Sequence, residues 1–183
     1  MKKIESYKLF DPTNIVKGLP VEAPGNYIFL LRPDVVLPTD MIAEQPAFTT
    51  LTYDGTAYRV LYTGVTKDSL YRRVFKIHLM GNNAGRSTLR KSLGCLWGYT
   101  FVARDKKPNS TKTKFADMDE TSITVWMRKN LLVLFVPNSN FEADEQELID
   151  TFNPPLNLDK NHNIVNLNYR QQLKVLRKRK IGE

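Results

Sequence analysis

Residues 58–78 read YRVLYTGVTKDSLYRRVFKIH, and this stretch decides how the chain is read. The first half is an apolar run that breaks at Thr63-Gly64, which is typical of the end of a strand. The second half is basic, carries apolar residues at helical spacing, and follows Asp68 or Ser69 as a candidate N-cap. The stretch therefore predicts a strand followed directly by a basic helix.

Working outward toward the N-terminus, residues 25–31 read GNYIFLL and predict another strand. Residues 32–48 contain three prolines, which indicates an irregular excursion. Residues 51–64 read as two strand segments around Asp54-Gly55, which is a good hairpin turn signal. The N-terminal half thus predicts strands joined by one long excursion and one tight turn.

The C-terminal half alternates between the two periodicities. Helices are predicted over residues 86–98, 119–130, 140–152 and 169–180, strands over 99–105 and 131–137, and an exposed loop over 106–119. Ser87 is a candidate cap for the first of these helices and Asn140 for the third, which stops before Pro154-Pro155. This order predicts one α+β domain.

Composition limits the classes of partner and compartment. The 183 residues include 27 Lys plus Arg against 19 Asp plus Glu, a net charge of +8 that favours a polyanionic partner. Cys95 is the only cysteine, which suits a reducing cytoplasm and reads as a small core residue. No secretory signal or membrane-length apolar run is evident, so no membrane partner is expected, and two distant histidines give no zinc spacing.

Two charged residues fall on apolar helix stripes. Arg73 comes three residues after Leu70, and Glu145 comes four residues before Ile149. A charge on such a stripe is costly unless it is paired or borders a cleft. A buried or half-buried Arg73–Glu145 salt bridge, or stems that reach out to solvent, would satisfy the pattern. So would a site in which Arg73 holds an anion and Glu145 a cation.

Five short motifs follow one another in an informative order. They are GNY at 25–27, YTG at 62–64, LxxR ending at Arg73, ExxLI beginning at Glu145, and NPPLN ending at Asn157. This ordered set resembles the GIY-YIG nuclease superfamily. The resemblance implies an α+β fold with a small antiparallel β-sheet flanked by helices. It also implies a catalytic domain at 25–160 with an insertion at about 32–57, an N-terminal segment at 1–24 and a basic tail at 161–183.

The resemblance further implies a divalent-metal-dependent endonuclease that hydrolyses DNA phosphodiester bonds. Glu145 would be the one protein carboxylate on Mg²⁺ (or Mn²⁺), an ion that keeps several waters and takes hard oxygen ligands. Arg73 would bind the scissile phosphate. Tyr27 and Tyr62 would position or activate the attacking water, and Asn157 would fix the end of the helix that carries Glu145.

Two assignments stay open. His78 follows Arg73 by five residues, whereas the Tyr or His of the family usually follows by four, so it is either a candidate base or a surface histidine. Arg72 is the rival of Arg73 for the phosphate. The chain also departs from the family at the middle of both tripeptides, where Asn26 and Thr63 replace isoleucines.

Cations outside the motifs are candidates for contact with the nucleic acid backbone. These residues are Lys67, Arg72, Arg86, Arg90, Lys91, Arg177 and Lys178. Arg86 and Arg90 stand one helical turn apart, and the basic tail is either a clamp or a frayed, solubilising end. Two other functions compete with the nuclease: a catalytically inactive nucleic-acid-binding domain of the same fold, and a basic structural domain.

Overall fold

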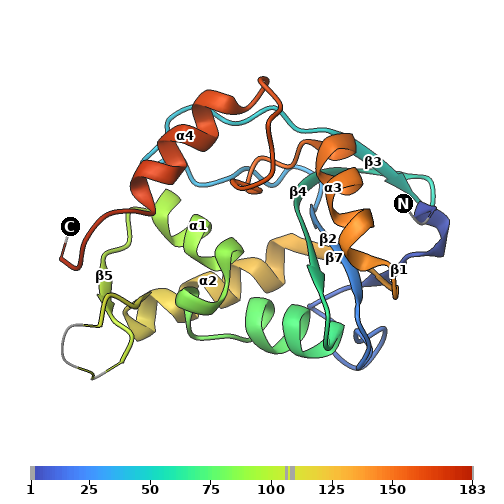
Figure 1. The fold of residues 1–183 in the computed structure, drawn as a ribbon, viewed down its shortest axis with the longest axis horizontal. Helices are drawn as coiled ribbons and strands as arrows, with labels where there is room; N and C mark the ends of the chain where they lie inside the picture. Colours follow the sequence, from blue (N-terminus) through green and yellow to red (C-terminus); the bar gives the residue numbers. More distant parts are fainter. Residues whose placement is uncertain (1–2, 106, 108–109, 183) are drawn as a thin grey trace.

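The computed structural model describes residues 3–105, 107 and 110–182. Its main sheet is antiparallel throughout, with strand order β1-β7-β2-β4-β3 (Figure 1). The strands are β1 (Lys8–Phe10), β2 (Gly25–Leu31), β3 (Thr50–Tyr53), β4 (Thr56–Thr66) and β7 (Leu131–Pro137). β2 is buried along its whole length because it is central and covered on both faces.

Helices and one small sheet complete the fold. They are η1 (Ile4–Ser6), the π-helix η2 (Tyr71–Leu79), η3 (Ala84–Arg86), α1 (Thr88–Leu96), β5 (Phe101–Ala103), β6 (Thr113–Phe115), α2 (Asp117–Asn130), α3 (Phe141–Phe152) and α4 (Leu167–Leu176). The predicted fold class, an α+β domain with an antiparallel sheet flanked by helices, is confirmed.

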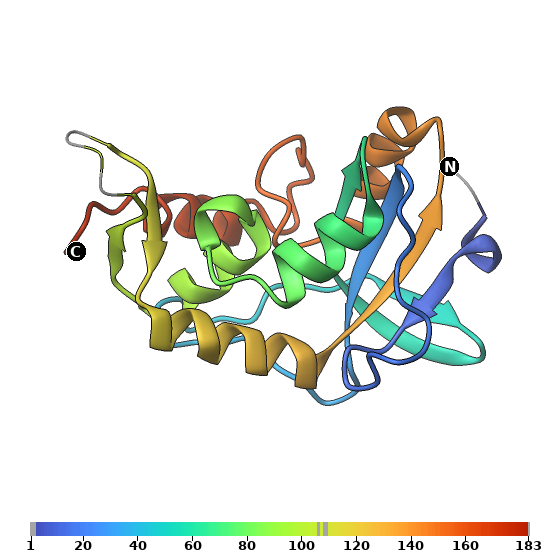
Figure 2. The ribbon, with the colours of Figure 1, turned by 90° about the horizontal axis from the view of Figure 1, so that it is seen from below.

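Alternation along β2 divides the core into two clusters. Tyr27 and Phe29 belong to the larger cluster, which includes residues of η2, α1 and α2. Ile28 and Leu30 belong to the smaller one, which includes Leu148 of α3. Figure 2 shows η2, α1 and α2 together on one side of the sheet. The sheet therefore separates the two core clusters, and the helices on either side of it are positioned by packing against it.

The excursion after β2 carries no strand or helix from residue 32 to residue 49, as predicted. It is nevertheless packed, since Leu37 and Ile42 are buried. The backbone of Ala47 exchanges two hydrogen bonds with the Asn166 side chain at the start of α4, at 3.0 and 2.8 Å. Figure 1 shows this segment running beside α4, so the insertion and the C-terminal helix support one another.

Several local predictions can be compared with the structure. The hairpin turn is confirmed, with Asp54 and Gly55 at positive φ (47° and 72°) between β3 and β4. The exposed loop predicted at 106–119 is wrong in part, because Thr113–Phe115 forms β6 and Phe115 is fully buried. Residues 106, 108 and 109 of that loop lie outside the described residues. No helix among the residues described has the length and apolar character needed to cross a bilayer.

Candidate functional site

The Tyr27 side chain explains why residue 64 is a glycine. The two residues are direct partners in the β2–β4 register. A Cβ on Gly64 would overlap the Tyr27 ring and hydroxyl, so only glycine leaves room for the ring at this position. The glycine of the second tripeptide thus seats the tyrosine of the first.

Tyr62 lies on the same face of the sheet as Tyr27, next to a β-bulge. Phe29 pairs with Tyr62 but Leu30 pairs with Val60, which leaves Leu61 as an extra residue in β4. Tyr62 lies opposite Phe29 and two residues from Gly64, so ordinary alternation places it on the face of Tyr27, and the bulge shifts only the residues of β4 before Tyr62. The two tyrosine rings lie with centroids 6.4 Å apart. Tyr27 is fully buried, whereas 9% of Tyr62 is exposed.

Two side chains of η2 meet at the Tyr27 hydroxyl. Arg73 donates to it from Nε at 3.2 Å, and His78 Nε2 lies 2.9 Å from it. A π-helix closes i→i+5 hydrogen bonds, as from the Met80 N–H to the Phe75 carbonyl at 2.9 Å, so residues five apart stand one turn apart. The five-residue spacing therefore places both side chains on one target. The reading of His78 as a surface histidine is wrong, because the residue is fully buried.

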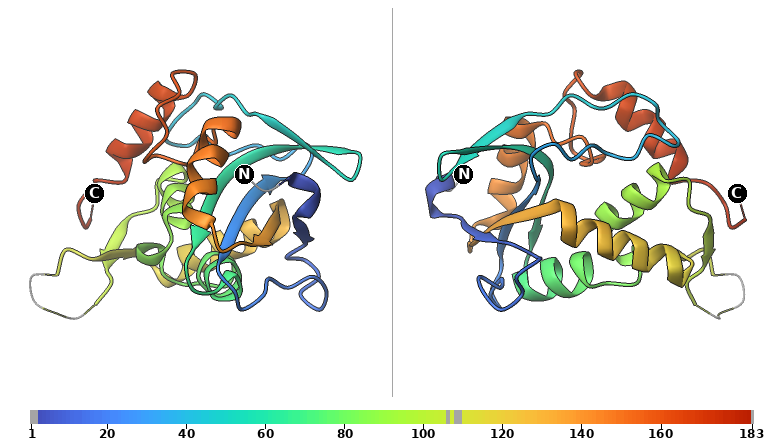
Figure 3. Two further views of the ribbon diagram at one scale, coloured as in Figure 1. Left: turned by 45° about the vertical axis from the view of Figure 1, so that its right-hand side comes forward. Right: turned by 180° about the vertical axis from the view of Figure 1, so that it is seen from behind.

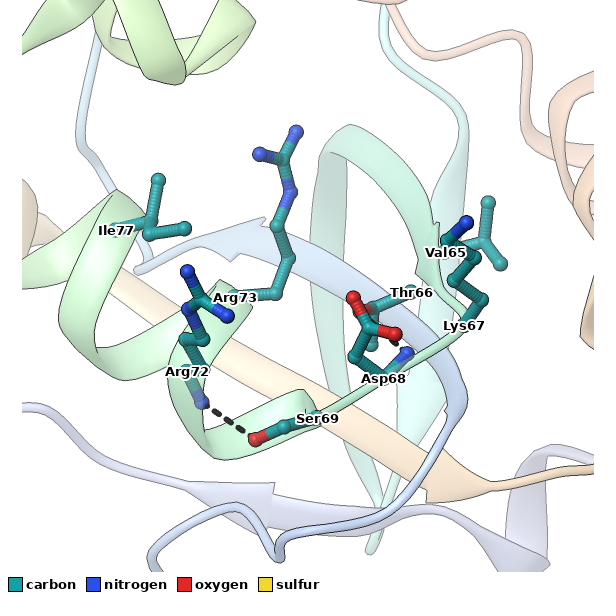
Figure 4. A pocket seen from close by; sticks show the side chains of 8 residues that line it. All are labelled: Val65, Thr66, Lys67, Asp68, Ser69, Arg72, Arg73 and Ile77. Carbon is teal, nitrogen blue, oxygen red and sulfur yellow. Dashed lines mark hydrogen bonds between the residues drawn. The ribbon is translucent and has the colours of Figure 1, made fainter.

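Arg73 and Arg72 take different directions from η2 (Figure 4). Arg73 is half-buried and donates a second hydrogen bond, from its terminal nitrogen to the Arg86 carbonyl at 2.9 Å. Arg72 is exposed, and its backbone N–H donates to Ser69 Oγ at 2.9 Å, which makes Ser69 the side-chain cap. Arg72, Arg73 and Lys67 line one open cavity of about 340 Å³.

His78 is held from behind by Ser87. Its Nδ1 lies 2.7 Å from Ser87 Oγ, which also accepts the Arg90 N–H at 3.1 Å as the N-cap of α1. We assign the Ser87 hydroxyl proton to Nδ1, which places the imidazole proton on Nε2, where it faces Tyr27. Burial, reinforced by the charges of Arg73 and Arg90, holds the pKa of His78 well below its usual value. The low pKa keeps His78 neutral, and in this assignment it donates a hydrogen bond to the tyrosine.

Arg90 is buried, not a phosphate contact. Its guanidinium is fully covered and donates to the Glu120 carboxylate at 2.8 and 3.1 Å and to the His78 carbonyl at 3.1 Å. The prediction that Arg90 contacts nucleic acid in step with Arg86 is wrong, because Glu120 of α2 satisfies it in the core. The pair instead fixes the end of η2 against α2.

Glu145 lies in a cavity of about 150 Å³ that Tyr62 and Thr88 also line. Its side chain is 18% exposed and pairs with Lys160 Nζ at 2.7 Å, so the expected alternative of an Arg73–Glu145 salt bridge is not what forms. The hydroxyls of Tyr62 and Thr88 are 2.9 Å apart. The cavity thus gathers one carboxylate, one phenol and one hydroxyl.

Asn157 closes the free edge of β4 at the second motif. Its Oδ1 accepts the Thr63 N–H and its Nδ2 donates to the Thr63 carbonyl, both at 2.9 Å. β3 pairs only with residues 56–59 of β4, and the side chain of Asn157 takes the place of a neighbouring strand farther along. This ties the segment after α3 to the strand that carries Tyr62.

Asn26, the departure in the first motif, joins β2 to α3. Its Nδ2 donates to the Phe141 carbonyl at 2.8 Å, and its Oδ1 accepts from Asn138 Nδ2 at 2.8 Å. Asn138 also donates to the buried carboxylate of Asp144 at 2.9 Å. An isoleucine at position 26 would lose this network, so the asparagine helps set where α3 begins.

The donor set is sparse, which suits an ion that keeps its water shell. Within the described ranges, no three His, Cys, Asp or Glu side chains come together as a metal cluster. The cavity lined by Tyr62 and Thr88 contains two carboxylates, Glu145 and Asp159, and Glu145 remains partly accessible. Mg²⁺ binds through one or two carboxylates together with waters and phosphate oxygens, so these residues fit Mg²⁺ or Mn²⁺.

Sequence reasoning missed three partners in the site. Ser87 was visible as a helix cap, but its contact with His78 depends on how η2 and α1 meet. Thr88 and Lys160 gave no signal, because their contacts with Tyr62 and Glu145 cross 26 and 15 residues of chain. Of the predicted cations, Arg86 and Lys178 are exposed, while Lys91 and Arg177 are half-buried.

Comparison with known families agrees with this geometry. The family model described as the GIY-YIG catalytic domain matches residues 25–179. The match begins at the first residue of β2 and extends through α4. Curated proteins and solved structures compared with the chain gave no match.

Proposed function

The chain belongs to the GIY-YIG catalytic domain family, and we propose that it is an endonuclease that hydrolyses DNA phosphodiester bonds with a divalent metal. One observation carries the proposal: Tyr27 anchors Arg73, while the neighbouring Tyr62 lines a cavity with Glu145. A phosphate-binding cation and a metal-binding carboxylate thus flank one pair of tyrosines.

Arg73 binds the scissile phosphate in this proposal. Its guanidinium is held by the Tyr27 hydroxyl and the Arg86 carbonyl, which leaves other N–H groups for an anion. A positioned guanidinium offsets the charge that grows on the phosphate oxygens in the transition state. Because it is already fixed, little side-chain entropy is lost when substrate binds.

Glu145 would hold Mg²⁺ or Mn²⁺. When bound, the metal supplies Lewis-acid stabilisation of the leaving 3′ oxygen. Lys160 now pairs with Glu145, but the Lys160 side chain is 62% exposed, so its ammonium can turn to solvent when another cation binds. The carboxylate is therefore available to a competing cation.

The two tyrosines take different roles. Tyr62 is the one that lines the Glu145 cavity, where its hydroxyl lies 2.9 Å from that of Thr88. Tyr27 is buried, and this burial raises the pKa of its phenol. The neighbouring Tyr62 raises that pKa further, whereas the charge of Arg73 lowers it. Tyr27 is accordingly a positioning residue for Arg73, and Tyr62 positions or activates the attacking water. Asn157 holds the strand beneath Tyr62.

The charge of +8 and the exposed cations next to Arg73 fit a nucleic acid, and we propose DNA as the substrate. Lys67 and Arg72 line the cavity on the η2 side and would contact the backbone near the cut. The free, buried Cys95 suits work in the reducing cytoplasm.

The test is a cleavage assay on duplex, flap, branched and single-stranded DNA with Mg²⁺ or Mn²⁺, run beside Glu145→Ala. The proposal expects metal-dependent cutting by the wild type alone. The Lys160–Glu145 ion pair favours one other function, a catalytically inactive nucleic-acid-binding domain. That function expects salt-sensitive binding and no cutting with any metal. Equal activity of both proteins would remove Glu145 from the metal site.

A further inference from the structure

A basic groove lies beside the site, between the β5–β6 hairpin and the start of α1. Its volume is about 310 Å³, and its charged lining residues are Arg86, Lys91, Arg104, Lys112 and Arg177. The described residues that line it include no carboxylate. Figure 3 shows the hairpin and the C-terminal end of the chain at the same end of the molecule, and the Gly182 N–H donates to the Phe101 carbonyl at 3.3 Å.

We propose that this basic groove binds the sugar-phosphate backbone of duplex nucleic acid beside the cleavage site. The inference rests on the proposed function for the identity of the polyanion. It adds a binding surface that Arg73 and Glu145 do not form, and it assigns to β5 and β6 a task in holding substrate.

The groove is continuous with the site at two points. Arg86 lines the groove, and its carbonyl accepts the hydrogen bond from Arg73 at 2.9 Å. Thr88 and Arg177 line both the groove and the Glu145 cavity. A backbone lying in the groove would therefore reach the phosphate position at Arg73 without leaving the protein surface.

The positive surface continues along α4. A neighbouring cavity of about 360 Å³ shares Lys91 and Arg177 with the groove and adds Lys174 and Lys178, against one carboxylate, Asp159. Burial, together with the charge of Arg177, lowers the pKa of Lys91. Cations crowded in this way repel one another, and a polyanion relieves that repulsion.

The lining favours a duplex over a single strand. Proteins that hold single strands stack bases on aromatic side chains, and the described residues that line the groove include no aromatic residue. The Phe101 ring already has a cation over it, since Lys91 Nζ lies 4.7 Å from the ring centroid. Arginines, lysines and threonines offer contacts to phosphates, which a duplex presents while its bases remain stacked inside.

The walls of the groove are fixed before substrate binds. The Arg104 N–H donates to the Lys112 carbonyl at 2.9 Å, which pairs the two sides of the hairpin. A Cβ on Gly85 would overlap the Thr113 carbonyl, so η3 and β6 are in close contact through this glycine. Among the residues that the structure describes, Arg104 has one ion-pair contact, with Asp105 at 3.9 Å, which is long enough to leave its charge available.

The experiment measures binding in the Glu145→Gln background without metal, so that no cutting intervenes. Arg104→Gln/Lys112→Gln is compared with Lys8→Gln/Lys129→Gln, which removes two exposed cations on β1 and at the end of α2. The affinity for a fluorescent DNA duplex, and for one of its strands, is followed from about 50 to 200 mM salt. Urea unfolding checks that both double variants are folded.

The proposal expects the groove variant to lose about 1.8 from the slope of log K against log salt, at about 0.9 per phosphate contact. It expects the control variant to keep the wild-type slope and the duplex to bind more tightly than the strand. An unchanged slope, or tighter binding of the single strand, would overturn the groove even if the wild type cuts DNA. A reduced slope in a chain that cuts nothing would support the groove and refute the nuclease.

Discussion

His78 lies five residues beyond Arg73, yet both side chains reach the same oxygen, the hydroxyl of Tyr27, at 2.9 and 3.2 Å. The π-helical geometry of η2 makes this possible, because its turn holds one more residue than an α-turn. π-Helical turns of this kind occur frequently at functional sites. The arrangement makes Tyr27 the contact that links Arg73, the proposed phosphate ligand, to a buried histidine.

Replacing Tyr27 by Phe tests the role of this hydroxyl contact. The variant removes the oxygen that fixes Arg73, and a displacement of about 1 Å in a positioned group costs roughly 10²-fold in rate. We expect the single-turnover cleavage rate to fall by that order while the substrate affinity changes little. The unmet His78 N–H costs about 1–3 kcal/mol of stability, which urea unfolding measures. A rate equal to that of the wild type would remove Tyr27 from the positioning role.

Replacing Ser87 by Ala tests the tautomer of His78. The chain has two histidines, so the ring ¹⁵N shifts of His78 can be separated from those of His162. We expect the wild type to show Nε2–H, and the variant to lose this preference together with about 1 kcal/mol of cap energy. Ser87→Thr keeps the hydroxyl and should keep the tautomer. A Nδ1–H signal in the wild type would contradict the assignment.

The buried His78 also predicts how stability depends on pH. Its pKa in the fold lies well below the ordinary value of about 6.5, so the unfolded chain takes up the proton first as the pH falls. The stability contributed by neutral His78 is complete above about pH 6.5 and is lost below it, by up to about 1.4 kcal/mol per unit. Urea titrations should show this extra slope in the wild type and not in His78→Gln. Parallel slopes in the two proteins would contradict a depressed pKa.

Lys160 is expected to compete with the metal. Its ammonium occupies Glu145 at 2.7 Å, so Lys160→Met should free the carboxylate and lower the Mn²⁺ concentration at half-saturation several-fold. Calorimetry without nucleic acid measures this directly. Lys174→Met, an exposed lysine on α4, is the matched control. Equal Mn²⁺ affinity in the wild type and Lys160→Met would place the metal elsewhere.

Local patterns predicted the elements of the fold well, because the signals lie within short stretches. The Asp54-Gly55 turn, the buried run at 131–137 and the Ser87 cap all depend on neighbouring residues. β6 escaped detection because a three-residue strand in a polar segment has no period to read. What identifies it is the burial of Phe115, which is a tertiary fact.

The site was harder to predict, because its contacts join distant segments. Arg90 has the sequence pattern of an ordinary basic helix residue, and only the tertiary structure shows that it pairs with Glu120 of α2. The five-residue spacing from Arg73 to His78 is irregular for an α-helix. It fits the π-helix that forms, and no sequence pattern predicts a π-helix here. The sequence showed that Arg73 and Glu145 lie on apolar helix stripes. It did not show that Glu145 pairs with Lys160, because this contact depends on the path of the chain after α3.

The most direct test of the central claim is the single-turnover hydrolysis of a labelled DNA duplex in Mn²⁺ by the wild type, Arg73→Ala and Glu145→Gln. Removing one positioned charge-stabilising group typically costs about 10²–10³-fold. We predict cutting by the wild type and a loss of at least that size in each variant, while both stay folded and bind the duplex. A wild type that binds the duplex but never cuts it, or variants that cut at the wild-type rate, would contradict the account.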